Sequence, residues 1–368
     1  MKKFVKMSLV AAATLAGFSS NVSANTLTEV ASNFDVFGYA QVRYDDSDTK
    51  GSSYTHKEVL GASGKLTDDI SYMFAGANLE IDPTNGSADY SSLLMVYNYF
   101  TYTGIKNTSI AAGKQGVDTP YTVVYDPATA TSEANGVSVT TKLGNVNLTA
   151  AYFANTNFEL GDAVGLFPGT TAIDGGESYV NIGASTNIGA LSVDAWYTTM
   201  EDRYDSYTIG LKGNIKVGNG MITPFARYTA ADIDGIDDDQ SLWKAGVKAK
   251  YGIVGAEVAY GETNEEGGWV TYDDDASLNL QGWKVSLLGK KDAKLTKVGL
   301  NVDIIPEVNL SATYADMEIE SAADEKEMYA TVKYQITKGL SAYVRMGQLE
   351  VDGLEDETLG RANILWLF

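Results

Sequence analysis

The last eight residues of the chain, RANILWLF (361–368), form an apolar stretch rather than a polar tail. In an extended backbone, Ile364, Trp366 and Phe368 lie on one face, because side chains alternate between the two faces of a strand. A free chain terminus is usually frayed and hydrophilic. The stretch therefore predicts a terminal strand that is paired with another strand and places its aromatic face against an apolar medium.

The first 24 residues, MKKFVKMSLVAAATLAGFSSNVSA, contain three lysines, then an apolar run, then small residues that end at Ala24. This order is typical of a secretory signal peptide. The apolar run is shorter than the roughly 20 residues that a membrane-spanning helix needs. We expect export and cleavage after Ala24, which leaves residues 25–368 as a single domain.

The composition excludes several classes of function. With 27 basic and 48 acidic residues, the net charge of −21 does not favour nucleic acid. The chain has no cysteine, so it has neither disulfides nor thiolate metal sites. His56 is the only histidine, and no nucleophile motif accompanies it. We therefore expect no enzyme activity.

A period of two residues dominates the chain. VGLNVDII (298–305) and MYATVKYQI (328–336) both alternate apolar residues with small or polar ones. Such alternation is typical of strands with one apolar and one polar face. The prediction is an all-β protein.

The connections between these strands differ regularly in length. Tight turns such as KLGNVNL (142–148) and NIGALSV (187–193) alternate with longer acidic segments such as ADIDGIDDDQ (231–240) and EIESAADEKE (318–327). A transmembrane antiparallel β-barrel has this pattern, with short periplasmic turns and long extracellular loops. A soluble β-sandwich would also alternate, but its loops would not sort by length in this way.

The predicted strand count is about 18, and 16 strands remain possible. An even number is expected for a bacterial single-chain barrel. LQGWKVSLLG (280–289) resembles a further strand, but a lone extra crossing would invert every later loop. We therefore assign 264–293 to a long extracellular loop that carries its own hairpin. The predicted strands are 35–45, 56–66, 70–82, 92–104, 108–116, 136–143, 146–156, 178–188, 191–201, 205–216, 221–231, 240–251, 253–263, 294–305, 308–319, 326–337, 340–350 and 358–368.

The barrel explains the terminal strand. An open strand edge is not tolerated in hydrocarbon, so RANILWLF must pair with the first strand, DVFGYAQVRYD (35–45). Ile364, Trp366 and Phe368 would then face lipid, with the aromatic rings near the periplasmic interface.

With its signal peptide, its terminal Phe368 and Trp366, and its alternating connections, the chain resembles the general porins of Gram-negative outer membranes. Two stretches, FDVFGYAQVRYDD (34–46) and GKQGVDTPYTVVYDPATATSEANGVSV (113–139), look like the major outer membrane porins of the Campylobacter type. The resemblance implies an outer-membrane location and a water-filled channel for passive diffusion of ions and small hydrophilic solutes. It also implies that the barrel-insertion machinery reads the terminal strand.

In such porins the third long loop folds into the barrel and narrows it, and here that loop is DTPYTVVYDPATATSEAN (118–135). Its bulky residues suit packing on the inner wall, whereas an ordinary exposed loop would carry more charge. We expect a constriction formed by Asp118, Tyr121, Tyr125, Asp126 and Glu133.

The polar faces of the strands carry more basic than acidic residues. A basic wall opposite an acidic loop would create a transverse field at the narrowest point, although water can also simply solvate lysines that line a lumen. The acidic loops favour cations, so we expect weak cation selectivity. The wall residues we select are Arg43, Lys65, Lys114, Arg227, Lys248, Lys333, Arg345 and Arg361.

Further expectations concern partners and ions. The small residues of SIAAGK (109–114) suit packing against a second barrel, and the resemblance implies a homotrimer among lipid and lipopolysaccharide. Acidic runs at 237–239 and 273–275 offer oxygen ligands for Ca²⁺ or Mg²⁺, although such runs are more often solvated. The alternative function is a non-conducting structural or adhesin barrel that presents acidic surface loops.

Overall fold

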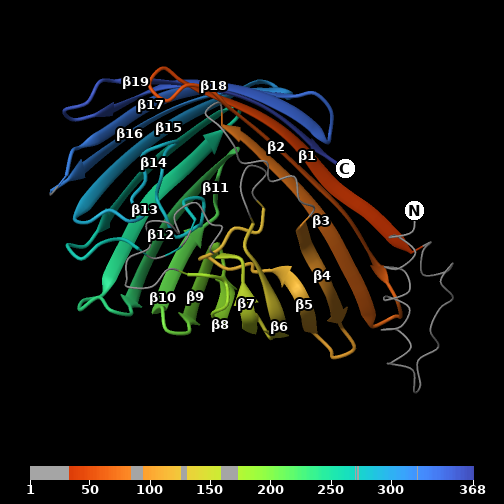
Figure 1. Cartoon of the computed structure of the whole chain (residues 1–368). Coiled ribbons are helices and arrows are strands. Elements are labelled where there is room, and N and C mark those ends of the chain that lie inside the picture. Colours follow the sequence, from red (N-terminus) through yellow and green to blue (C-terminus); the bar gives the residue numbers. More distant parts are fainter. Residues whose placement is uncertain are drawn as a thin grey trace.

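The computed structural model describes residues 33–83, 94–125, 131–158, 173–269, 271, 273–320 and 322–368. These residues form strands joined by turns and loops (Figure 1). No helix within these ranges is both long and apolar enough to span a membrane. The strands are β1 (Phe34–Ser47), β2 (Ser53–Lys65), β3 (Ile70–Pro83), β4 (Leu94–Tyr102), β5 (Thr108–Gly116), β6 (Glu133–Leu143), β7 (Val146–Thr156), β8 (Tyr179–Ile188), β9 (Leu191–Met200), β10 (Tyr204–Gly213), β11 (Ile215–Val217), β12 (Gly220–Ile233), β13 (Gln240–Tyr251), β14 (Val254–Thr263), β15 (Ala293–Ile305), β16 (Val308–Ile319), β17 (Glu325–Gln335), β18 (Leu340–Val351) and β19 (Glu357–Leu367).

The strands form one closed antiparallel barrel. Each strand pairs with its neighbours in sequence, except that β10 and β11 do not pair with each other, and β1 also pairs with β19. β10 and β11 both pair with β12 and are separated only by Asn214, so they form a single interrupted crossing. The barrel therefore has 18 crossings, and the predicted all-β barrel is confirmed.

The terminal strand closes the barrel as the sequence predicted. Ala40 lies opposite Trp366, and Val42 lies opposite Ile364. The amide of Gly38 donates to the carbonyl of Phe368, and the amide of Phe368 donates to that of Gly38, both at 3.0 Å. No strand edge remains open at this seam.

Alternation divides the side chains between an apolar exterior and an interior. On β2, Leu60 is 61% exposed on the outside, whereas Lys57 is only 3% exposed and lies inside. Trp366 and Phe368 are half-exposed on the outer surface, with ring centroids 4.5 Å apart. The exterior of β19 thus carries the aromatic residues that the terminal sequence led us to expect there.

The short and the long connections between strands lie at opposite rims of the barrel. Two-residue turns such as 144–145 and 252–253 lie at one rim, whereas the longer connections after β5, β7 and β14 begin and end at the other. Within the described part of 264–292, the only bridges are the isolated pairs Asn264–Gly267 and Gln281–Ser286, so this segment adds no crossing.

Candidate functional site

The segment after β5 enters the barrel and spans its interior (Figure 1). The Tyr121 hydroxyl oxygen accepts a hydrogen bond from Ser206 on β10 at 3.4 Å. Four residues later, the ring of Tyr125 lies edge-on to Tyr39 on β1, with centroids 5.2 Å apart. Since β1 and β10 stand on opposite sides of the ring of strands, residues 121–125 bridge it.

A compact turn fixes the path of this segment. The Thr119 and Thr122 hydroxyls lie 2.9 Å apart, and the Tyr121 amide donates to the Thr119 hydroxyl at 3.2 Å. The Val117 amide donates to the carbonyl of Ser132 at 2.9 Å, which ties the two ends of the loop together. Local side-chain bonds of this kind hold a backbone turn in place of ladder bonds.

One prediction about this loop is wrong in its boundary. Glu133 was expected in a loop that ends at residue 135, but it is the first residue of β6. Its carboxylate accepts a bond from Thr131 at 2.5 Å and lies 3.4 Å from the Lys114 ammonium. With only 3% of its side chain exposed, Glu133 forms a buried polar anchor at the base of the loop.

The described residues of 264–292 also fold inward, contrary to the extracellular placement expected from the sequence. Thr271 donates from its hydroxyl to the Tyr121 carbonyl. Ser277 donates to the Pro120 carbonyl at 3.3 Å. Leu278 and Leu287 are fully buried. The two loops therefore pack on each other inside the barrel.

Two charged side chains from the strands hold this second loop. Glu327 on β17 accepts the backbone N–H groups of Trp283 at 2.5 Å and Lys284 at 2.7 Å. Lys244 on β13 donates to the carbonyl of Ser277 at 2.7 Å. Buried charges are tolerated when such bonds satisfy them, so both residues serve as anchors.

We name the interior against β7–β16 the core side. Its strands turn apolar residues inward, including Leu242, Leu295 and Met317, each at most 1% exposed. The two loops cover these residues and form one continuous apolar cluster with them. This cluster occupies the long-loop half of the core side.

The interior against β17–β19, β1 and β2 is different, and we name it the arginine side. Arg345 on β18 lies in register with Arg361 on β19, and Arg361 lies in register with Asp45 on β1. Asp45 forms ion pairs with Arg361 and, at 3.1 Å, with Arg43. Two guanidinium groups thus contact one carboxylate, and Arg345 lies on the neighbouring strand beside Arg361.

Trp283, which belongs to the segment 264–292, lies against Arg345 and Arg361. The Arg345 and Arg361 guanidinium carbons are 5.2 and 5.4 Å from its ring centroid. Both distances are within the range of a cation–π interaction. Arg43, Arg361 and Asp45 retain side-chain exposures of 14–25%, so solvent still reaches this cluster.

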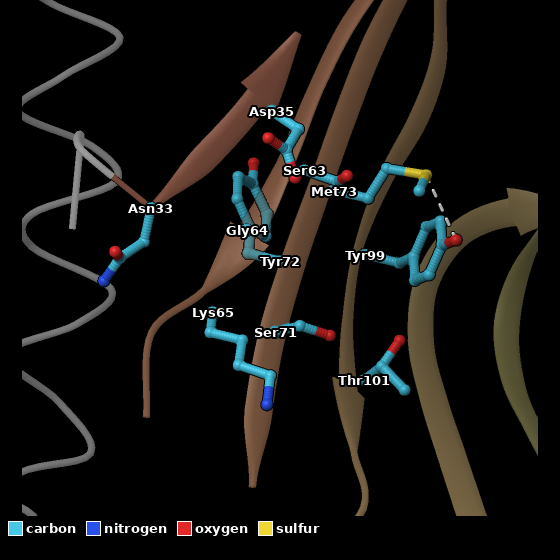
Figure 2. Close-up of a pocket in the computed structure, with 10 residues that line it drawn as sticks. All are labelled: Asn33, Asp35, Ser63, Gly64, Lys65, Ser71, Tyr72, Met73, Tyr99 and Thr101. Carbon is cyan, nitrogen blue, oxygen red and sulfur yellow. Dashed lines mark hydrogen bonds between the residues drawn. The ribbon is translucent and has the colours of Figure 1, made fainter. Parts of the chain in front are cut away.

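The remaining predicted wall residues do not gather at one level. Arg227 binds Asp194 through two contacts of 2.8 Å on the core side. Lys248 lies 3.6 Å from Glu257 and is more than half-exposed, and Lys333 is also exposed. Lys65 lies at the short-turn rim, where it lines a hollow of about 640 Å³ (Figure 2).

That hollow is a polar recess on the inner wall of β1–β4. Asp35, Ser63 and Lys65 line it together with Tyr99, whose hydroxyl donates to the Met73 sulfur at 3.2 Å (Figure 2). The recess therefore presents an acidic group, Asp35, and a basic group, Lys65, near the short-turn rim.

Three predicted loop residues have different surroundings. Asp118 is exposed and Tyr125 is 45% exposed, while Tyr121 is only 2% exposed. Asp126 lies outside the described residues. Burial raises the pKa of the Tyr121 hydroxyl, so this group stays neutral at physiological pH.

Lys284 is the charged residue that follows Trp283 in the segment 264–292. Burial lowers the pKa of its ammonium, and the nearby Arg361 charge lowers it further. The Asp45 carboxylate acts in the opposite direction, so Lys284 lies among charges of both signs.

The acidic run at 273–275 is engaged by its own loop. Ser286 donates to Asp274 at 2.7 Å, Gln281 donates to Asp275 at 2.5 Å, and the Asp275 amide donates to Asp273 at 2.8 Å. Among the residues that the structure describes, no group of three acidic or histidine side chains converges as a metal site.

The sequence reasoning missed Trp283 and Glu327. A signal was present, because the inward face of a strand can become apolar near its long-loop end. In ATYADMEI (312–319), for example, Met317 and Ile319 are buried inside the barrel, whereas the outward Glu318 is exposed. Apolar inward residues at one strand end indicate that something inside the barrel covers that end.

Comparison of the sequence with family models and with curated proteins gives no match. The fold is similar to solved outer-membrane channels of Pseudomonas aeruginosa. OccK5 (OpdH) has a TM-score of 0.74 and 15% identity, covering 92% of this chain and 98% of that one. OccK2 (OpdF), solved with glucuronate, has a TM-score of 0.76 and 12% identity over 92% and 98%. OpdK, solved with vanillate, has 0.74 and 12% over 92% and 99%. At these identities the similarity establishes the shared barrel fold.

Proposed function

We propose that this chain is an outer-membrane porin through which ions and small hydrophilic solutes diffuse passively. The observation that carries the proposal is a closed barrel with an apolar exterior and a charged interior. An apolar exterior suits lipid, and a charged interior suits water. The narrower resemblance to Campylobacter-type porins belongs to this proposal as well.

The passage runs along the arginine side. The long-loop half of the core side is filled by apolar side chains that exclude water. By contrast, Arg43, Asp45 and Arg361 remain partly exposed at the same end of the barrel. Solutes therefore pass between these residues and the Tyr121–Tyr125 bridge.

We further propose weak cation selectivity for inorganic ions. The net charge of −21 and the exposed Asp118 near the long-loop end would concentrate cations at the mouth. The arginines act in the opposite direction, so the preference is expected to be small and to weaken at high ionic strength.

A second candidate is a channel selective for small carboxylates. Arg345, Arg361 and Trp283 favour it, because guanidinium groups bind carboxylates through paired hydrogen bonds and an aromatic face can guide a ring. Glucuronate and vanillate, the ligands of two structurally similar channels, both carry such a group.

Conductance in a planar bilayer tests the proposal. Refolded protein should give stepwise current increments, and the reversal potential in a salt gradient should show a small cation preference. Glucuronate added to one side should reduce the current if the second candidate holds. Folded barrels that pass no current would contradict both, and would favour the structural or adhesin alternative.

The proposed partners follow from the same assignment. They are a homotrimer of this chain, outer-membrane lipid with lipopolysaccharide, and the barrel-insertion machinery that would read Ile364, Trp366 and Phe368. Ca²⁺ or Mg²⁺ could bridge the acidic loops to lipopolysaccharide, since carboxylate oxygens are the ligands these ions prefer.

A further inference from the structure

The recess at the short-turn rim contains two opposite charges that the fold does not pair. Asp35 on β1 and Lys65 on β2 both line it, and both side chains are exposed. Within the described part of the chain, neither side chain has a hydrogen-bond or ion-pair partner. Elsewhere at this rim, by contrast, the Lys250 ammonium lies 2.7 Å from the Asp303 carboxylate. Asp35 and Lys65 are therefore available to a ligand.

Strand register sets the spacing between these two charges. Asp35 lies opposite Ser63, and Lys65 lies opposite Ser71 on β3. Because Ser63 and Lys65 share one face of β2, Asp35 and Lys65 are diagonal neighbours, which lie roughly 7–8 Å apart in an antiparallel pair. An α-amino acid carries its ammonium and carboxylate on one carbon, so with a hydrogen bond at each end it spans a gap of this order.

Hydroxyl groups surround both charges. Figure 2 shows Ser63 beside Asp35 and Ser71 beside Lys65, as the register requires. The Tyr99 hydroxyl donates to a methionine sulfur, which leaves its oxygen as an acceptor. Since hydroxyls both donate and accept, they suit a ligand that has an anionic and a cationic end.

We propose that this recess binds small zwitterions of the α-amino acid class, with the ammonium against Asp35 and the carboxylate against Lys65. Asp35 repels a simple anion and Lys65 repels a simple cation, whereas a zwitterion is attracted by both groups. The recess is a binding site in addition to the proposed channel, and the outer-membrane placement proposed above makes its rim the periplasmic one.

The recess is separate from the arginine cluster at the other end of the passage. Asp35 and Arg43 both belong to β1 and lie roughly 26 Å apart at about 3.3 Å per residue. Tyr39, against which Tyr125 packs, lies between them on the same strand. A small solute cannot contact both ends at once. The recess therefore binds solutes that have passed Tyr39 or that enter from the short-turn rim.

Protection of an introduced thiol tests the site, because the natural chain has no cysteine. In refolded Ser71→Cys, N-ethylmaleimide should label the recess, and L-alanine should slow this labelling in a saturable way. L-Lactate has a hydroxyl in place of the ammonium, and isopropylamine has a methyl group in place of the carboxylate. Each should protect at least about tenfold less well than L-alanine. Equal protection by the three solutes, or no protection by L-alanine, would overturn the proposal.

Charge variants in the Ser71→Cys background test the two ends of the ligand separately. Asp35→Asn and Lys65→Gln should each raise the L-alanine concentration for half-protection at least about tenfold. The matched control Lys338→Gln, at an exposed lysine of the same rim, should leave that concentration unchanged. Heat-dependent migration in gels verifies that each variant is a folded barrel. Unchanged half-protection in either recess variant would also overturn the proposal.

The outcome is distinguishable from that of the channel proposal, because labelling is measured without a current. Barrels that L-alanine protects but that pass no current would contradict the channel alone. Barrels that conduct without protection by L-alanine would contradict the zwitterion site alone.

Discussion

The core side and the arginine side are built by strands with the same alternation, yet their interiors are opposite in character. On the core side, strands β12–β16 turn residues such as Leu295 and Met317 inward, and two loops cover them. On the arginine side, the inward residues include Arg43, Arg345 and Arg361, and the loop contributes Trp283 and Lys284 beside them. The inward faces of the strands thus determine which part of the lumen is filled and which part stays polar.

The first test removes packing from the core side. Leu287→Ala should lower the free energy of unfolding by about 2–5 kcal/mol, because the side chain is fully buried among the loop and strand residues. Urea titration of refolded protein measures this loss. The exposed Leu354→Ala, with 70% exposure, should change it by less than about 0.5 kcal/mol. Similar losses in both variants would contradict the buried core.

The second test weakens the attachment of the segment 264–292 to Glu327 on β17. Glu327→Gln keeps the size of the side chain but places an amide against the N–H groups of Trp283 and Lys284. Losing a charge-assisted bond of this kind should cost about 1.5–3 kcal/mol and loosen the loop. Trypsin should then cleave after Lys284 faster than in the wild type. The exposed Glu307→Gln is the control, and equal cleavage rates in both variants would argue against the anchor.

The third test acts on the arginine side alone. Arg345→Gln should weaken block of the current by a small carboxylate roughly tenfold, since about 1.4 kcal/mol corresponds to a factor of ten. It should also shift the reversal potential toward cations. Lys216→Gln, at an exposed position on β11, should change the block little. An unchanged block in Arg345→Gln would remove the carboxylate candidate.

The smallest expected effect concerns Lys284 and pH. Its pKa in the folded protein lies below the ordinary value of 10.5, so the unfolded chain binds the proton more tightly. The stability of the wild type relative to Lys284→Met should therefore rise with pH, from the lowered pKa up to about 10.5, and level off above it. Urea titrations of both proteins across this range measure the difference. A flat difference would mean that Lys284 is solvated.

The strands could be predicted from the sequence because alternation and tight turns are local. The structure places β15 and β16 within one residue of the predicted ranges 294–305 and 308–319. Closure through residues 361–368 followed from the impossibility of an open edge in lipid.

The interior could be predicted only in part. Tyr121 and Tyr125 were selected from a bulky stretch, and both pack inside the barrel. The position of 264–292 depends on contacts between residues far apart in sequence, such as Thr271 with Tyr121 and Trp283 with Glu327. No local pattern encodes those contacts.

The central question about the molecule is which side of the interior carries the passage. Lys333→Cys on the arginine side and Ala259→Cys, a buried position on the core side, can each be treated with a water-soluble thiol reagent during conductance recording. If the passage runs along the arginine side, the current should fall in steps for Lys333→Cys and stay unchanged for Ala259→Cys. A fall with Ala259→Cys and none with Lys333→Cys would contradict it.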